Sequence, residues 1–429
     1  MSNNSPTPAV HLPREIKVLV AGAFLIAIGF GIVAPVLPQF ARSFDVSVSA
    51  AAVVVSVFAL TRLLFAPLSG VLVERMGERR TYIAGILIVG ASSAACAFAH
   101  DYWQLLIYRG LGGIGSTMFT VAAMGLLIRL APPQARGRVS SVYSGSFLLG
   151  SIAGPVVGGL LAGFGLALPF LVYAGALVLV AALVAWQLRE PAHDGGALAT
   201  AVGAASVSGS GGTSGAAGAP SAGARTVTMA ALQEALPLRE ALGQSAFRAA
   251  LASAFANGWS AMGIRMALVP LFATAALGAG PEVAGISLAV FAIGTAAALA
   301  FSGRLADTWG RKPMVVLGLV VNAAAMAVLG LSGNEFIFFA ISAIAGFGSG
   351  LMGPALQATM ADVIGNGRSG GRPLAVFQMS GDLGSIIGPI AAGVLVDALS
   401  YEAAFAIAAA VSAVAVLTWL GTKDTRQPL

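Results

Sequence analysis

One acidic residue, Asp382, stands apart because it lies in the middle of a long apolar segment, whereas the rest of the 17 acidic residues lie at the ends of such segments or between them. A helical rise of ~1.5 Å per residue places it about 15 Å from the start of its segment. Gln378 and Ser385 share its helix face, since neighbours on a face are spaced three or four residues apart. A carboxyl group in this setting can take up and release a proton. We therefore predict that Asp382 is a proton-coupling residue facing a cavity.

Three arginines also fall inside apolar segments: Arg62, Arg109 and Arg265. A charge in an apolar environment is costly unless it faces protein or water, so these side chains are expected to point inward. An arginine near a carboxyl group favours its charged form, so we expect Arg265 to influence when Asp382 releases its proton. Two structural alternatives stay open: a permanent ion pair between Asp382 and an arginine, and a fixed interhelical contact made by Arg62.

Polar and adaptable side chains accompany these charges. Asn257, Ala261 and Arg265 are spaced four apart and are expected to share one helix face. Methionine supplies flexible apolar contact. Three arginines against one carboxylate leave a positive balance, which favours neutral or anionic ligands over cations. The residues predicted to line a substrate cavity are Arg62, Arg109, Met118, Asn257, Met262, Arg265 and Gln378.

The composition identifies the solvent around these residues as lipid. Hydrophobic residues make up 58% of the chain and charged residues 9%, and the mean hydropathy is +0.89. Apolar runs long enough to cross a bilayer as helices recur along the chain. We predict an all-α membrane protein of twelve transmembrane helices in two pseudo-symmetric six-helix halves. The spans begin near Ile16, Ser47, Thr81, Trp103, Val139, Leu166, Phe247, Val283, Met314, Phe336, Pro373 and Ala403.

Prolines and basic residues refine this topology. Pro35 and Pro38 should bend the outer end of the first span, and Pro270 should close the seventh. Lys and Arg concentrate in the tails and loops of one side, which by the positive-inside rule is the cytoplasm, so both termini are expected there. The same rule accounts for the sequence pI of about 9.9 without a nucleic-acid partner. Residues 1–15 show no cleavable signal peptide.

The chain repeats itself halfway. Gly70, Glu74 and Gly77 correspond to Gly303, Asp307 and Gly310 at an offset of 233 residues. A second glycine pattern, at residues 150–159, returns at residues 384–393 with an offset of 234. The glycine and charged residues of the first pair of copies are Gly70, Glu74, Gly77, Arg80, Gly303, Asp307, Gly310 and Arg311. The second pair predicts helix packing and bending at Gly150, Gly154, Pro155, Gly384, Gly388 and Pro389.

These repeats divide the chain into a cytoplasmic tail (1–15), a first half (16–189), a linker (190–245), a second half (246–421) and a second tail (422–429). The linker is rich in glycine, alanine and serine between residues 195 and 224 and is expected to be flexible. Residues Met229 to Gln244 read as a short amphipathic helix on the membrane surface.

These motifs resemble those of major facilitator superfamily transporters, and the chain is most similar to the twelve-helix drug:proton antiporter branch. The two copies of the first pair resemble the family's loop motif, Arg109 with Gly113 its helix-four motif, residues 150–159 its antiporter motif, and Pro35 with Pro38 its helix-one signature. Glu74 stands where the family usually has Asp, and Glu78 where a basic residue is usual. The first span also lacks the acid that cation-exporting relatives often place there.

The resemblance implies alternating access, in which two six-helix halves rock about a central site. It also implies that the two copies of the loop motif, which we call the gate copies, form a cytoplasmic gate. Glu74 and Asp307 would latch this gate by pairing with arginine and with a helix N-terminus. We interpret the chain as a proton-coupled exporter of small amphipathic, neutral or anionic, drug-like molecules in a bacterial-type inner membrane. Import by proton symport, sodium coupling and a non-transporting receptor are the alternatives.

The remaining expectations concern partners and chemistry. We expect a monomer whose partners are a small-molecule substrate, protons and the lipid bilayer, with no nucleic acid, no cofactor and no metal. The chain shows no nucleophile with a base and no cluster of metal-ligating residues, which speaks against an enzyme. The histidines lie outside the spans, and Cys96 is the single cysteine, which excludes an internal disulfide.

Overall fold

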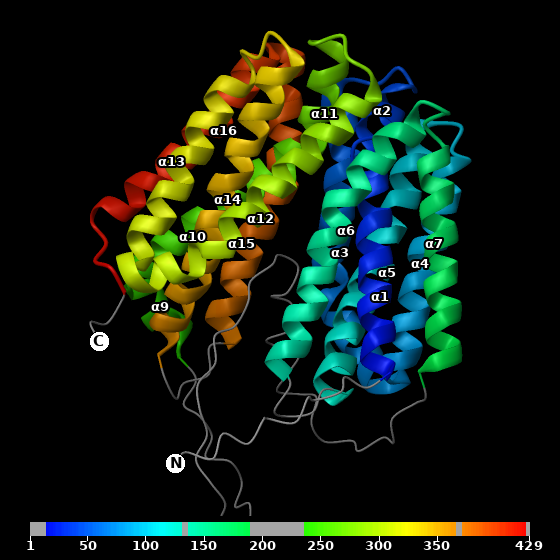
Figure 1. Cartoon of the computed structure of the whole chain (residues 1–429), viewed down its shortest axis with the longest axis horizontal. Coiled ribbons are helices and arrows are strands. Elements are labelled where there is room, and N and C mark those ends of the chain that lie inside the picture. Colours follow the sequence, from blue (N-terminus) through cyan, green and yellow to red (C-terminus); the bar gives the residue numbers. More distant parts are fainter. Residues whose placement is uncertain (1–13, 131–135, 189–235, 366–370, 426–429) are drawn as a thin grey trace, which may run out of the picture.

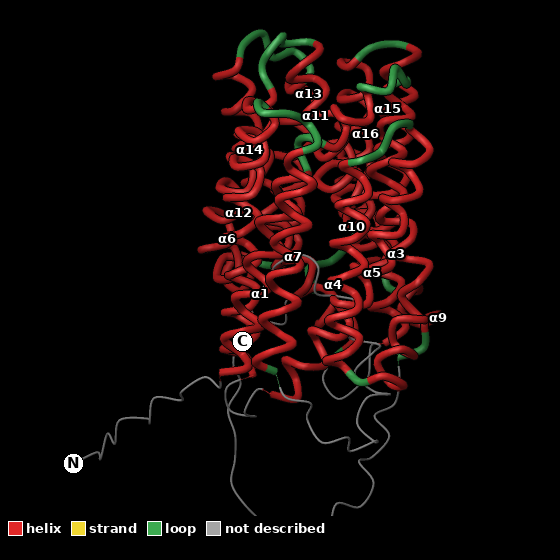
Figure 2. The backbone as a smooth tube through the Cα atoms, turned by 90° about the vertical axis from the view of Figure 1, so that its right-hand side faces the viewer, coloured by secondary structure: helices red, strands yellow, loops and turns green. Residues whose placement is uncertain are grey.

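The computed structural model describes residues 14–130, 136–188, 236–365 and 371–425. Within these ranges the secondary structure is helical, and Figure 2 shows no strand there. The first group of helices comprises α1 (Arg14–Val33), α2 (Leu37–Arg42), α3 (Val48–Met76), α4 (Glu78–Ala97), α5 (Tyr102–Leu130), α6 (Arg136–Ala162) and α7 (Leu168–Gln187). The second comprises α9 (Leu238–Gly243), α10 (Ser245–Asn257), the π-helix η2 (Gly258–Ile264), α11 (Arg265–Ala275), α12 (Pro281–Trp309), α13 (Arg311–Leu329), α14 (Glu335–Ile364), α15 (Gly371–Ala398) and α16 (Tyr401–Leu420).

Each predicted span begins within three residues of a helix start in the structure. Eleven helical segments of the described chain are long and apolar enough to cross a membrane. The seventh predicted span is absent from that count because η2 divides it into shorter pieces, although α10, η2 and α11 follow one another without a gap from Ser245 to Ala275. The predicted twelve-helix membrane fold is therefore confirmed.

Two helix ends were predicted from proline, with different outcomes. At the end of the first span, α1 stops at Val33 and α2 begins at Leu37, so the chain turns at Ala34–Val36 as expected. The prediction that Pro270 closes the seventh span is wrong, because α11 continues through Pro270 to Ala275. Proline is tolerated inside membrane helices when other groups compensate for the lost backbone bond. In the turn that follows the proline, the Thr274 hydroxyl donates to the Pro270 and Leu271 carbonyl oxygens at 3.3 and 3.2 Å.

The helices form two groups that lie side by side in Figure 1, α1–α7 in blue to green and α10–α16 in green to red. One cluster of buried apolar residues, including Leu19, Ile86 and Leu177, belongs mainly to the first group. Two further clusters, around Phe272 and around Trp419, belong mainly to the second. Apolar packing is thus concentrated within each group.

We call the end of the bundle at which α1 begins and α16 ends the terminal end, and the opposite end the far end. Between the groups, α3 packs on α15 and α6 packs on α12. The Ser56 hydroxyl donates to the Ile386 carbonyl oxygen at 2.8 Å. At the far end, the Val48 and Ser49 N–H groups of α3 donate to Asp397 of α15 at 2.9 and 2.8 Å. Figure 1 shows the two groups meeting near the far end and diverging towards the terminal end.

The α3–α4 and α12–α13 connections consist of one glycine each. Gly77 lies between Met76 and Glu78 with φ +83°, and Gly310 lies between Trp309 and Arg311 with φ +117°. Residues other than glycine rarely adopt such positive φ values, which is why both repeats carry glycine here. The predicted loop motif is therefore a sharp reversal between two helices.

Part of the predicted linker and both tails lie outside the described residues. Of the predicted surface helix from Met229 to Gln244, the structure describes residues from Leu236 onward, and Leu238–Gly243 form α9. Ala241 is its buried residue. The predicted flexible tract at residues 195–224 and the tails 1–13 and 426–429 are not described.

Candidate functional site

Asp382 lies in the middle of α15 and is half-buried. The Gln378 amide nitrogen donates a hydrogen bond to its Oδ1 atom at 3.1 Å, which shows that the two side chains share a helix face. The carboxylate sits one turn to the terminal side of Ile386, the residue of α15 that contacts Ser56 of α3. Asp382 therefore lies just beyond the point at which α3 and α15 meet.

Arg62 of α3 is the arginine whose charge reaches Asp382. The two residues belong to different helix groups and form no ion pair within 4.0 Å in the described part of the chain, so they interact across a gap. Arg265, the arginine expected to act on Asp382, lies over an aromatic ring of α12, and its influence on Asp382 stays a prediction. The permanent ion pair weighed as an alternative is absent between Asp382 and the described arginines.

Arg265 is the first residue of α11, immediately after η2, and is 1% exposed. Its guanidinium carbon lies 3.8 Å from the centre of the Phe291 ring on α12. A cation over an aromatic face is favourable, more so where water is excluded. Its three guanidinium nitrogens have no hydrogen-bond partner among the described residues. The structure thus buries a positive charge on one aromatic ring.

Arg109 of α5 shows the same arrangement in the first group. Its guanidinium carbon lies 4.1 Å from the centre of the Phe58 ring of α3 and 6.0 Å from that of Phe30 of α1. Its Nε atom is buried without a hydrogen-bond partner in the described chain. Arg109 and Arg265 are therefore cations with free hydrogen-bonding capacity held by aromatic rings.

The seventh span differs from the α-helical spacing assumed for it. Because η2 is a π-helix, its turns hold more residues than the α-helical turns assumed for Asn257, Ala261 and Arg265, and their shared face stays a prediction. Ala261 is 7% exposed and Met262 is 45% exposed, while the Asn257 Oδ1 atom is buried without a partner in the described structure. π-Helical turns are rare and occur often at functional sites. Nothing in the local sequence distinguishes residues 258–264 from an ordinary helix.

Glycine allows η2 to lie close to α15. A β-carbon on Gly384 would stand 2.8 Å from the Trp259 backbone nitrogen, and one on Gly388 would stand 2.9 Å from the Trp259 carbonyl oxygen. The first group repeats this packing between α6 and α1, where a β-carbon on Gly150 would stand 2.7 Å from the Phe24 carbonyl oxygen, and one on Gly154 would overlap the Ile28 carbonyl oxygen. Both glycine patterns thus bring their helix close to the first membrane-spanning segment of the same group.

Prolines of these patterns also lie at close contacts. A β-carbon on Gly31 would stand 2.8 Å from the Pro155 ring, and one on Gly263 would stand 2.9 Å from the Pro389 ring.

Met118, one of the predicted cavity residues, is 6% exposed on α5. The structure therefore packs it in the first group, away from Asn257 and Met262.

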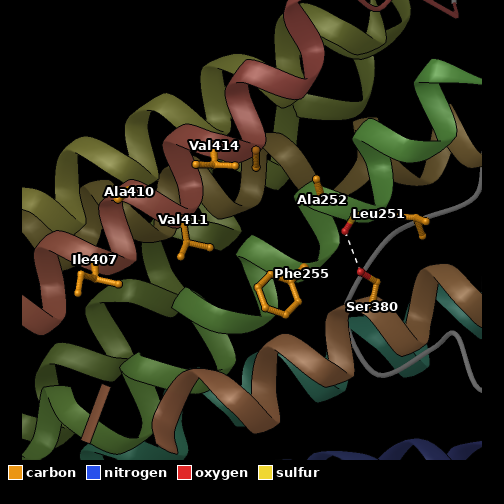
Figure 3. Close-up of a pocket in the computed structure, with 9 residues that line it drawn as sticks. Leu251, Ala252, Phe255, Ser380, Ile407, Ala410, Val411 and Val414 are labelled. Atoms are coloured by element: carbon orange, nitrogen blue, oxygen red, sulfur yellow. Dashed lines mark hydrogen bonds between the residues drawn. The ribbon is translucent and has the colours of Figure 1, made fainter. Parts of the chain in front are cut away.

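A groove of the described chain lies within the second group. It has a volume of about 410 Å³ and lies between α10, α15 and α16 (Figure 3). Ser380 lies two residues from both Gln378 and Asp382 and hence on the other side of α15. Its hydroxyl donates to the Leu251 carbonyl oxygen at 2.9 Å, which leaves an apolar groove. The lining residues are Leu251, Ala252, Phe255, Ser380, Ile407, Ala410, Val411, Val414 and Ala415.

The first gate copy places its acids differently from expectation. Glu74 is exposed in the last turn of α3, whereas Glu78, which follows Gly77, is 2% exposed. A β-carbon on Gly125 of α5 would stand 2.9 Å from the Glu78 Cγ atom, so glycine there makes room for the glutamate. Gly70 is buried in α3, and Arg80 is exposed at the start of α4. Sequence reasoning noted Glu78 as a departure from the family but did not assign it a site.

The second gate copy forms a polar network at the terminal end. Arg311 lies 3.5 Å from Asp307 and 3.1 Å from Asp362 of α14. The Arg311 backbone N–H donates to the carboxylate of Asp424 at 3.2 Å, and the Thr425 hydroxyl donates to Asp362 at 2.9 Å. Gly303 is exposed in α12. Asp362, Asp424 and Thr425 were not predicted, because they are far from the motif in the sequence.

Comparison with known proteins agrees with this architecture. A family model described as Major Facilitator Superfamily matches residues 19–264 and 250–429. The quinolone resistance protein NorA of Staphylococcus aureus is 29% identical over 168 residues, which is 39% of this chain and 43% of NorA. Multidrug resistance protein 2 of Bacillus subtilis is 29% identical over 166 residues, 39% of this chain and 41% of that protein. The matched segments thus span less than half the length of these relatives.

Solved structures extend the likeness to nearly the whole chain. The inward-facing, unoccupied crystal structure of a bacterial homolog of the human lysosomal transporter Spinster superposes with a TM-score of 0.73 at 17% identity, covering 96% of this chain and 98% of that one. The human organic anion transporter MFSD10 superposes with a TM-score of 0.62 at 17% identity, covering 95% and 100%. At this identity the likeness concerns the fold. The family model carries the assignment, and the chain belongs to the Major Facilitator Superfamily, a family of transporters and not of enzymes.

Proposed function

We propose that this chain is a proton-coupled exporter of small amphipathic molecules that works by alternating access. The observation that carries the proposal is the position of Asp382, a half-buried carboxylate on α15 that faces the charge of Arg62 on α3 without pairing with it directly. Because the two residues belong to different helix groups, a movement between the groups changes the field at the carboxylate. Protonation of Asp382 and rearrangement of the groups are thereby coupled.

We infer that the two moving bodies are residues 16–189 and 246–421, joined by the linker 190–245. In this structure the groups meet from the middle of the helices towards the far end and diverge at the terminal end (Figure 1). The basic residues of the terminal end, among them Arg75, Arg79 and Lys312, support a cytoplasmic location for this end under the positive-inside rule. The structure is then open to the inside of a bacterial-type inner membrane. We take the monomer as the working unit.

The gate repeats then act in the opposite conformation. Glu74 is exposed here, and Asp307 and Arg311 contact each other within the second group. We propose that closing the cytoplasmic side brings the acids of the two copies against helix N-termini of the other body, where the helix dipole favours negative charge. We include the turns at Gly77 and Gly310 in this gate, because they set the direction of the helix ends that carry the acids.

The charges of the membrane region support neutral or anionic substrates. Arg62, Arg109 and Arg265 lie within the spans against one deep carboxylate, Asp382. NorA and multidrug resistance protein 2 carry names that refer to quinolone and multidrug resistance, which makes quinolones suitable probes. A quinolone acid and its methyl ester differ in one negative charge and little else. We propose that the acid is the preferred of the two.

Flux in proteoliposomes with an imposed pH gradient tests the proposal. The quinolone acid and its ester are compared in the parent protein, in Asp382→Asn and in Asp45→Asn, a control that removes an exposed carboxylate between α2 and α3. We expect gradient-driven flux of the acid in the parent and in the control and at least a tenfold loss in Asp382→Asn. Equal flux in all three proteins would refute coupling through Asp382, and equal flux of acid and ester would refute the charge preference.

A further inference from the structure

A contact between the two helix groups lies at the far end, outside both gate motifs. Asp397, in the last turn of α15, accepts hydrogen bonds from the backbone N–H groups of Val48 and Ser49 in the first turn of α3. The donor–acceptor distances are 2.9 Å to Oδ1 and 2.8 Å to Oδ2. The first N–H groups of a helix have no partner within the helix, and the helix dipole favours an anion beside them. A carboxylate of the second group thus caps a helix of the first.

The sequence of α3 supplies no charge of its own at this place. Its N-cap is Ser47, whose hydroxyl accepts a hydrogen bond from the Ala50 N–H at 3.1 Å, and its first turn holds no acidic residue. The Ser47 and Asp397 side chains therefore serve different N–H groups of the same turn. Asp397 completes the cap.

Comparison of the two repeats shows that this cap occurs on one side of the molecule. A β-carbon on Gly393 of α15 would stand 2.6 Å from the Ser49 Cα atom, and one on Gly159 of α6 would stand 2.9 Å from the Glu282 Cα atom of α12. The offsets of 234 and 233 that relate the repeats pair Gly393 with Gly159 and Ser49 with Glu282. The two contacts between the groups are thus equivalent in their backbones.

Four residues further along each helix, the equivalence ends. The residue four after Gly393 is Asp397, and the residue four after Gly159 is Gly163. The first turn of α12 has its own acid, Glu282, beside Gly280. One interface therefore has a carboxylate that reaches across it, and the other has a carboxylate that stays within its own helix.

We propose that Asp397 is a latch that stabilises the conformation closed at the far end. The inference rests on the proposed alternating access, because the acceptor and its donors lie on different bodies and must separate when the far end opens. Asp397 is exposed, so water can replace the protein donors when they part. Charge-assisted bonds at an exposed site stabilise modestly, and we expect the latch to change the ratio of closed to open far ends by about threefold to tenfold.

Distances between spin labels at both ends of the protein test the latch without any transported compound. With Cys96 replaced by serine, one pair is placed at Phe164 and Leu331, which lie in far-end loops and are 84% and 70% exposed. A second pair is placed at Trp186 and Leu420, at the terminal end, which are 80% and 69% exposed. The parent is compared with Asp397→Ala and with the matched control Glu282→Ala, which removes the acid of the equivalent turn.

We expect Asp397→Ala to raise the population of long far-end distances by about threefold to tenfold and to shorten the terminal-end distances in parallel. Glu282→Ala should leave both distributions as in the parent. Asp397→Asn retains one acceptor oxygen and should give a smaller shift in the same direction. This variant tests the latch if Asp397→Ala does not fold.

Three outcomes would overturn the inference. Distributions unchanged in both Asp397 variants would show that the contact does not hold the far end closed. An equal shift in Glu282→Ala would show that any loss of negative charge at this end has the same effect. A parent with one fixed distance at both ends, with and without a pH gradient, would instead refute the alternating access itself, which distinguishes failure of the proposed function from failure of the latch.

Discussion

Replacing Gly310 by alanine is expected to destabilise the protein through two separate effects. Gly310 has φ +117° and ψ 159°, a backbone conformation that is almost confined to glycine and costs another residue of order 1–3 kcal/mol. The new β-carbon would also overlap the carboxylate of Asp424, which accepts a hydrogen bond from the Arg311 N–H at 3.2 Å. Losing a cap at the start of an exposed helix costs about 0.5–1 kcal/mol. The free energy of unfolding should therefore fall by about 1.5–4 kcal/mol.

Gly303→Ala is the matched control, because it changes another glycine of the same motif copy in the middle of a helix. No atom lies within 4 Å of a β-carbon built on Gly303. Alanine in a helix interior is favoured over glycine by roughly 0.5–1 kcal/mol, so this variant should be as stable as the parent or slightly more stable. Apparent melting temperatures of the purified proteins in one detergent provide the comparison.

A double variant separates the two effects. If Ala at 310 already displaces the carboxylate, adding Asp424→Ala to Gly310→Ala should lower the melting temperature less than Asp424→Ala does alone. The reasoning is refuted if Gly310→Ala and the parent have the same melting temperature, or if Gly303→Ala loses as much stability as Gly310→Ala. Strict additivity in the double variant would remove the Asp424 contribution and leave backbone strain as the cause.

Two further predictions concern contacts within the membrane. Phe291→Ala removes the ring beneath the Arg265 guanidinium and should lower the free energy of unfolding by about 2–3 kcal/mol, which is below the range for a fully buried Phe because this ring is half-buried. Phe291→Tyr keeps the ring face and should change the stability little. Equal melting temperatures for both variants would contradict the cation–ring contact. Ser56→Ala removes the hydroxyl that donates to Ile386 at 2.8 Å, worth about 1 kcal/mol, and should shift the far-end distances in the same direction as Asp397→Ala. Unchanged distances would show that this bond does not hold the groups together.

The helices could be predicted closely from the sequence because membrane thickness determines their length and the solvent demands apolar residues throughout. Starts such as Ser47 and Asn334 coincide with side-chain caps, where the hydroxyl or amide accepts from the first turn at 3.1 and 2.9 Å. The π-helix at Gly258–Ile264 was not predicted, because the hydrophobicity of a segment does not distinguish an α-helix from a π-helix. Pro270 was misread because a proline inside a membrane helix does not end the helix when other groups satisfy the backbone carbonyl that loses its partner.

Those residues of the candidate site that are of a type rare within membrane spans could be predicted from the sequence. Asp382 is conspicuous as the one acid deep in a span, and the structure places it opposite Arg62. The choice between Arg62 and Arg265 depended on how helices of different groups face each other, which spacing within one helix does not reveal. Asp397 was overlooked because an acid near the end of a span resembles ordinary loop charge. Glu78 is buried while Glu74 is exposed because the backbone reverses at Gly77.

The cap on α13 has a consequence for the order in which the protein is made. The Arg311 N–H group and the Asp424 carboxylate that accepts its hydrogen bond are 113 residues apart in the chain. At synthesis rates of ~5–20 residues per second, the start of α13 leaves the ribosome about 6–23 s before its capping residue. Over that interval α14, α15 and α16 are still being inserted. The reversal at Gly310 is therefore completed only late in biogenesis, after the helices it connects are already in the bilayer.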